Sequence, residues 1–132
     1  MGLMMRQRAL LGLSLAAVYG GVLFAPVSAA AQTVSREKTE AAYQLALKCF
    51  VANGRAYSYW SDAHDEKRAT YFDIRAKHSW DVALRLSKQL GISSDRFEAD
   101  VDKTTDRELP LMVRNTEYFT QVANECKAYG LM

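Results

Sequence analysis

The sequence predicts an all-α protein, a small helical bundle held by one disulfide. Apolar residues recur at spacings of three and four along residues 57–90, which is the period of a helix with one buried face. Gly54, Gly91 and Gly130 fall where such stretches stop, and glycine readily takes the left-handed conformation that closes a helix. No segment alternates apolar and polar residues with the period of two that is typical of a strand.

The first 31 residues have the order of a secretory signal peptide. Arg6 and Arg8 precede an apolar run over residues 9–24, and small residues follow it up to Ala31. The run is about sixteen residues long, whereas a membrane-spanning helix needs roughly twenty, so we expect cleavage rather than a retained anchor. Small residues before the cut favour cleavage after Ala31 and, nearly as well, after Ala29.

Residues 32–132 are expected to form a single α-helical domain that is periplasmic or secreted. The whole chain has 17 basic and 15 acidic side chains, and the two surplus cations, Arg6 and Arg8, lie in the signal peptide. The domain that remains has zero formal charge and no basic run, which argues against nucleic acid as a partner. We also expect no stable membrane insertion after cleavage.

Two helices are expected in the first half of this domain. The first is expected over residues 35–53, with its N-cap at its first residue and Gly54 just past its end. The second is expected over residues 57–90, starting either at once or after a short turn with Ser61 as the N-cap, and it ends at Gly91.

A third helix is expected to begin at Ser93 or Ser94. One face of this helix is expected to contain Phe97, Val101, Thr104, Glu108 and Met112. Pro110 lies within this pattern, and because proline lacks a backbone donor it predicts a kink or break over residues 106–109. A final helix ends at Gly130 and has on one face Phe119, Val122, Ala123 and Cys126.

The two cysteines, Cys49 and Cys126, predict a disulfide, because a small exported domain usually needs a covalent link. Both lie near the expected C-terminal ends of their helices. A bond requires their Cα atoms to come within about 7 Å, so we expect the first and last helices to be parallel. This favours three long helices in an up-down-up order, with the last kinked or split near Pro110 to give four. The bond is worth about 4 kcal/mol on the chain-entropy model.

The densest aromatic cluster consists of Tyr57, Tyr59 and Trp60. These residues are expected at one end of the bundle, where a pocket for an apolar or aromatic compound can open. They are therefore the candidate ligand-binding residues. The alternative is that they close the core between the first two helices.

Other polar clusters do not define a chemical site. His64 and His78 lie fourteen residues apart on the expected second helix, roughly 21 Å along its axis, so one metal ion cannot bind both. An acidic stripe is either a binding face or an ordinary solvated face, and it consists of Asp95, Glu98, Asp102 and Asp106. We expect neither a bound metal nor a cofactor.

The pattern favours an exported, non-catalytic protein that binds an unidentified protein partner in the cell envelope. The surface has mixed charge, and the sequence contains no phosphate loop, nucleophile elbow or paired catalytic carboxylates. The alternative is a carrier of a small apolar or aromatic ligand, with its pocket near Tyr57 and Trp60. A hydrolytic or metal-dependent enzyme is supported only by His64 and its acidic neighbours.

Overall fold

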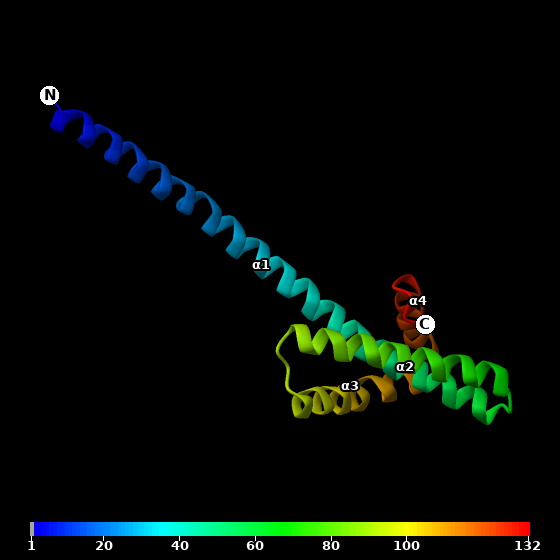
Figure 1. Cartoon of the computed structure of the whole chain (residues 1–132). Helices are drawn as coiled ribbons and strands as arrows, with labels where there is room; N and C mark the ends of the chain where they lie inside the picture. The colour runs from blue at the N-terminus through cyan, green and yellow to red at the C-terminus, as the bar shows by residue number, and fades with distance from the viewer. Residues whose placement is uncertain (1) are drawn as a thin grey trace. The chain divides into compact units, whose positions relative to one another are not determined.

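The computed structural model of the chain consists of four α-helices (Figure 1). They are α1 (Gly2–Asp62), α2 (Glu66–Gln89), α3 (Ser94–Arg114) and α4 (Thr116–Ala128). The structure describes the backbone of residues 2–132 and the side chains of residues 29–132, and no strand occurs within the former range. The predicted all-α class and small helical bundle are confirmed.

The chain divides into two units, Met1–Glu37 and Lys38–Met132. In the described part of the first unit, Thr33 Oγ1 donates to the carbonyl of Ala29 at 3.0 Å, a bond typical of threonine inside a helix. The N-cap predicted at Ser35 is wrong, because α1 passes through this position. The predicted signal peptide, residues 1–31, lies mostly outside the residues with described side chains and stays a prediction.

The helix end predicted at Gly54 is also wrong, since α1 continues to Asp62. The residue before the glycine explains the difference. Asn53 is completely buried, and its side-chain Nδ2 donates to the Cys49 carbonyl one turn earlier at 2.9 Å. This asparagine therefore packs into the core as an interior helical residue rather than ending the helix.

The turn after α1 is closed by His64, which has a left-handed backbone with φ of 57°. The amide of Asp65 donates to the Trp60 carbonyl at 2.9 Å and that of His64 to the Ser61 carbonyl at 3.1 Å, the bonding pattern of a glycine-terminated helix end. Asp65 then caps α2 by accepting from the Arg68 amide. Both predicted starts of the second helix, at residue 57 and after Ser61, are therefore wrong.

Because Gly54 lies inside α1, replacing it with alanine should stabilise the protein. A Cβ added at Gly54 meets no atom within 4 Å, so Gly54→Ala lowers the entropy of the unfolded chain without a steric cost. We expect the free energy of unfolding to rise by about 1 kcal/mol, measured by urea denaturation.

Gly91→Ala is the matched control for this substitution. Gly91 ends α2 with φ of 70°, and the Ile92 amide donates to the Ser87 carbonyl at 2.9 Å. A side chain disfavours this conformation, so we expect Gly91→Ala to destabilise the protein by about 1 kcal/mol. A loss of stability in Gly54→Ala similar to that in Gly91→Ala would contradict a continuous α1.

The face that α3 buries is the one predicted from its periodicity. Its buried residues are Phe97, Val101, Thr104, Glu108 and Met112. Ser93 is its N-cap and accepts from the Arg96 amide at 3.2 Å. Gly91 and Gly130 end their helices with positive φ, as expected. Four helices are confirmed, although the break that separates the last two differs from the predicted one.

This break lies at Asn115, not over residues 106–109, and Pro110 is contained within α3. Pro110 and Asp106 are both exposed, so the carbonyl that lacks a helical donor faces solvent rather than the core. Asn115 ends α3 in an extended conformation, and its side chain caps α4 by accepting from the Tyr118 amide at 3.0 Å.

Within the second unit, α1, α2 and α3 alternate in direction. Phe50 of α1 packs on Trp80 of α2, with ring centroids 5.3 Å apart, and Trp80 packs on Phe97 at the start of α3 at 4.9 Å. Near the C-terminal end of α3, Met112 lines the same cavity as Arg55 of α1. The up-down-up order of the first three helices follows.

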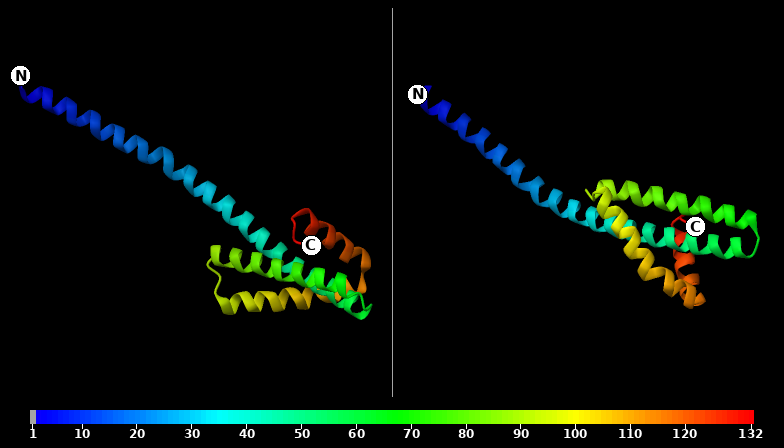
Figure 2. Two further views of the ribbon diagram at one scale, coloured as in Figure 1. Left: turned by 45° about the vertical axis from the view of Figure 1, so that its right-hand side comes forward. Right: turned by 90° about the horizontal axis from the view of Figure 1, so that it is seen from below.

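The disulfide between Cys49 and Cys126 is confirmed, with Cα atoms 5.7 Å apart. The predicted parallel arrangement of the first and last helices is wrong. Thr116 at the start of α4 lines the same cavity as Tyr59, and Glu125 near its end lines the same hollow as Ala41. Helix α4 therefore crosses α1 in the opposite direction (Figure 2). The inference failed because Cys49 lies well before the end of α1.

Two partly buried tyrosine–carboxylate hydrogen bonds attach α3 to its neighbours. The Tyr43 hydroxyl of α1 donates to Asp100 at 2.9 Å, and the Tyr118 hydroxyl of α4 donates to Glu108. Burial, together with the hydrogen bond to Glu108, raises the pKa of Tyr118 to about 12. Glu108 is only 4% exposed, and it accepts from the Tyr118 hydroxyl and from Arg107 Nε, which satisfies a carboxylate that would otherwise be costly to bury.

Candidate ligand-binding cavity

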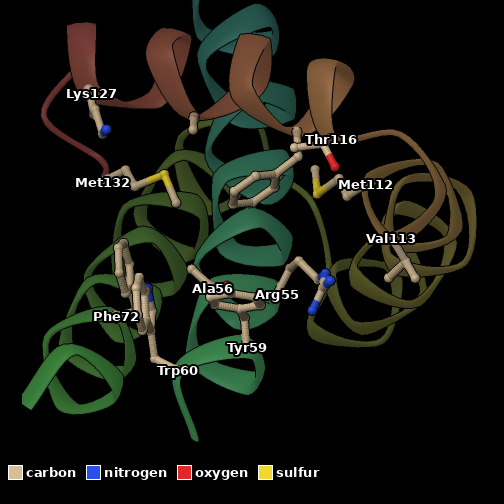
Figure 3. Close-up of a pocket in the computed structure, with 12 residues that line it drawn as sticks. Arg55, Ala56, Tyr59, Trp60, Phe72, Met112, Val113, Thr116, Lys127 and Met132 are labelled. Atoms are coloured by element: carbon tan, nitrogen blue, oxygen red, sulfur yellow. The ribbon is translucent and has the colours of Figure 1, made fainter. Parts of the chain in front are cut away.

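A cavity of about 400 Å³ lies where the end of α1, the start of α2 and the junction of α3 with α4 come together (Figure 3). Most of its wall is apolar or aromatic. The lining residues are Arg55, Ala56, Tyr59, Trp60, Phe72, Met112, Val113, Thr116, Phe119, Ala123, Lys127 and Met132. Each of the four helices contributes side chains, so the cavity depends on the assembled bundle.

Two of the three predicted ligand-binding residues, Tyr59 and Trp60, line this cavity, whereas Tyr57 does not. Residues 55, 56, 59 and 60 are pairs four apart, so they share one face of α1. Tyr57 lies on another side of the helix and is 43% exposed. Sequence alone does not fix this rotation, because it depends on α1 continuing through Gly54.

Ring contacts fix the orientation of the aromatic side chains in the wall. The rings of Tyr59 and Trp60 meet edge to face, with centroids 5.0 Å apart. The guanidinium carbon of Arg68 lies 4.3 Å from the centroid of the Trp60 ring, within cation–π range. In Figure 3, Trp60 lies next to Phe72 of α2. These contacts build one side of the cavity from two helices that meet at the His64 turn.

Besides the polar atoms of Tyr59 and Trp60, the wall contains two cations and a hydroxyl, contributed by Arg55, Lys127 and Thr116. Among the described residues, neither Arg55 nor Lys127 forms an ion pair, and no acidic side chain lines the cavity. Arg55 contacts the Tyr59 ring, with its guanidinium carbon 5.9 Å from the centroid. The cavity therefore combines an apolar wall with positive charge.

Met132, another lining residue, belongs to a segment that the sequence analysis missed. Residues Leu131 and Met132 fold back into the core and are 7% and 8% exposed. The Leu131 carbonyl accepts from Asn53 Nδ2 at 2.7 Å and from Ser79 Oγ at 3.0 Å, and the Gly130 carbonyl accepts from Arg75. The two apolar residues after Gly130 were the available signal, since glycine-terminated helix ends often bury the residue that follows.

The histidines and the acidic stripe form no comparable site. His64 lies in the exposed turn after α1, and His78 borders a separate hollow of about 610 Å³ between α1, α2 and the end of α4. The stripe is exposed and, in residues 29–132, makes no ion pair with another helix; its members are Asp95, Glu98, Asp102 and Asp106. Over the same residues, no cluster of three or more potential metal ligands is present.

Fold and cavity together define a small disulfide-linked helical bundle with a mainly apolar hollow at its end whose wall includes two cations. No protein-family model, curated protein or solved structure matches the chain. Within residues 29–132, no helix has the length and apolar character required to cross a bilayer. The disulfide is typical of proteins that fold in an oxidising compartment.

Proposed function

We propose that the protein is an exported carrier that binds a small apolar or aromatic compound in the cavity beside Tyr59 and Trp60. The observation that carries this proposal is a hollow of about 400 Å³ with a mainly apolar wall. Ligand pockets typically have about 300 to 1,000 Å³ and a few polar groups in an apolar lining. This cavity falls in that range and has a few polar groups, among them Arg55, Thr116 and Lys127, in a mainly apolar wall.

Export to the periplasm or the medium is part of the proposal. The order of charged, apolar and small residues before Ala31 favours a cleaved signal peptide. An oxidising destination also accounts for the disulfide. The cavity wall contains no cysteine, histidine or acidic side chain, which are the most common nucleophiles and bases, and this favours binding over catalysis.

A second candidate function is binding to a protein partner in the cell envelope. Tyr71 and Ile74 lie three residues apart on α2, and they are 50% and 59% exposed. Residues at this spacing share a helical face, so the pair presents apolar surface to solvent. In this function the aromatic wall of the cavity is structural, and the contact is made by the outer face of α2.

Native mass spectrometry of the protein purified from its own compartment separates the two functions. For a carrier we expect a small molecule bound at one per chain, released on unfolding. A stoichiometric protein partner without a small molecule would support the second function instead. The mass of the polypeptide also tests export, because cleavage after Ala31 leaves a chain that starts at Gln32.

A cavity-filling variant connects the bound molecule to this site. Ala123 is 7% exposed and lines the cavity, so Ala123→Leu places a larger side chain within it. Ala128 is exposed on the same helix and does not line the cavity, which makes Ala128→Leu the matched control. We expect Ala123→Leu to be purified without the small molecule and Ala128→Leu to retain it. Retention of the molecule in both variants would contradict binding in this cavity.

A further inference from the structure

We propose that the cavity selects organic anions, compounds with an apolar or aromatic body and one acidic group, over neutral compounds of the same shape. This inference rests on the proposed carrier function and names the chemical class of its ligand. It follows from the charges in the wall. Arg55 and Lys127 both line the cavity, no acidic side chain lines it, and neither cation has an ion-pair partner among the described residues.

Arg55 is the stronger of the two determinants. It is half-buried and contacts the Tyr59 ring, so solvent screens its charge less than that of an exposed arginine. An arginine stacked near an aromatic ring keeps its hydrogen-bond donors free at the edge of the guanidinium group. A carboxylate or sulfonate can accept two of these donors at once.

Lys127 supplies a second positive charge from α4. Figure 3 places its amino group on the Met132 side of the cavity and the guanidinium group of Arg55 on the Val113 side. The apolar wall lies between the two cations. A ligand with a single acidic group can therefore bind with that group at either end and its body against the aromatic residues. An apolar compound without charge satisfies neither cation.

The alternative role of Lys127 is to stabilise the C-terminal end of α4 without contacting a ligand. It lies in the last turn of α4, where a cation interacts favourably with the helix dipole. Arg55 has no such role, because it lies inside α1, seven residues before the helix ends. The two cations are therefore tested separately as well as together.

Two fluorescent probes with one carbon skeleton test the inference. Anilinonaphthalene sulfonate is anionic, and N-phenylnaphthylamine is its neutral counterpart. We expect the anionic probe to bind about tenfold more tightly than the neutral one at low salt, the factor typical of one charge-assisted hydrogen bond. The preference should decrease as salt is added, because the cations lie at the ends of an open cavity.

Substitutions assign the preference to the two cations. In the double variant Arg55→Gln, Lys127→Gln we expect the two probes to bind with equal affinity. Arg55→Gln alone should remove more of the preference than Lys127→Gln alone. Lys103→Gln is the matched control, since Lys103 is exposed on α3 and does not line the cavity. Thermal unfolding of each variant verifies that it remains folded.

The outcomes separate this inference from the carrier proposal. Equal binding of both probes to the unmodified protein, or a preference that persists in the double variant, would overturn the selection of anions while leaving the carrier function intact. An equal loss of preference in Lys103→Gln would also overturn it. If neither probe binds, or if Ala123→Leu leaves the binding of N-phenylnaphthylamine unchanged, the carrier function itself fails.

Discussion

Removal of the disulfide by the double substitution Cys49→Ala, Cys126→Ala is expected to lower the free energy of unfolding by about 4 kcal/mol. The two cysteines are 77 residues apart in sequence, so the bond greatly restricts the unfolded chain. In the folded protein both cysteines are completely buried, and alanine also leaves a small void there. Urea unfolding followed by helical circular dichroism measures the change.

Reduction provides the control for this prediction. A reductant should shift the unfolding midpoint of the unmodified protein to that of the double variant and should have no effect on the variant itself. An unchanged midpoint in both cases would show that the bond does not link the folded chain in solution. Because the bond joins α4 to α1, and both helices line the cavity, its loss should also weaken binding of the neutral probe.

Local sequence signals predicted the parts of this fold that depend on a single helix. The buried face of α3 follows from periodicity, and helix ends at Gly91 and Gly130 follow from the conformational freedom of glycine. The cysteine count and the expectation of export predicted the disulfide. Each of these features is set by residues close together in the chain or by covalent chemistry.

The errors arose where distant residues decide the local structure. Asn53 followed by Gly54 is a common signal for the end of a helix, yet the asparagine is buried by partners from α2 and from residue 131. The actual turn uses His64 in a left-handed conformation, which is uncommon for a residue with a side chain. This shift of the turn also made the argument for parallel cysteine-bearing helices invalid.

The aromatic part of the candidate site was predictable from the sequence, but its charged part was not. Tyr59 and Trp60 belong to a dense local cluster, so the sequence identified them. Arg55 and Lys127 are ordinary surface-type residues in the sequence, and only the crossing of α4 over α1 brings both to one cavity. The charge of the site, and hence the class of its ligand, is a property of packing between distant segments.

Asn53→Ala is expected to have the second-largest effect, a loss of about 2 to 3 kcal/mol of stability. The side-chain Nδ2 of Asn53 donates to the Leu131 carbonyl at 2.7 Å and to Ser79 Oγ at 3.3 Å, and all three residues are buried. Alanine removes these donors from a buried site and leaves the Leu131 carbonyl with the Ser79 hydrogen bond alone. Since Met132 lines the cavity, release of residues 130–132 should also weaken binding of the neutral probe.

Asn124→Ala separates this effect from the general consequence of replacing asparagine in a helix. Asn124 is exposed on α4, so its substitution should change stability by less than about 0.5 kcal/mol.

Hydrogen exchange gives a local measure of how residues 130–132 are held, because the Leu131 backbone amide donates to the Cys126 carbonyl at 2.8 Å in the closed turn. We expect the Leu131 amide to exchange faster in Asn53→Ala than in the unmodified protein, after correction for the difference in global stability. Equally slow exchange in the two proteins would mean that Asn53 does not hold residues 130–132 in place. The disulfide and this asparagine act one turn apart on α1, so the same short stretch of helix holds α4 covalently and the residues after α4 by hydrogen bonds.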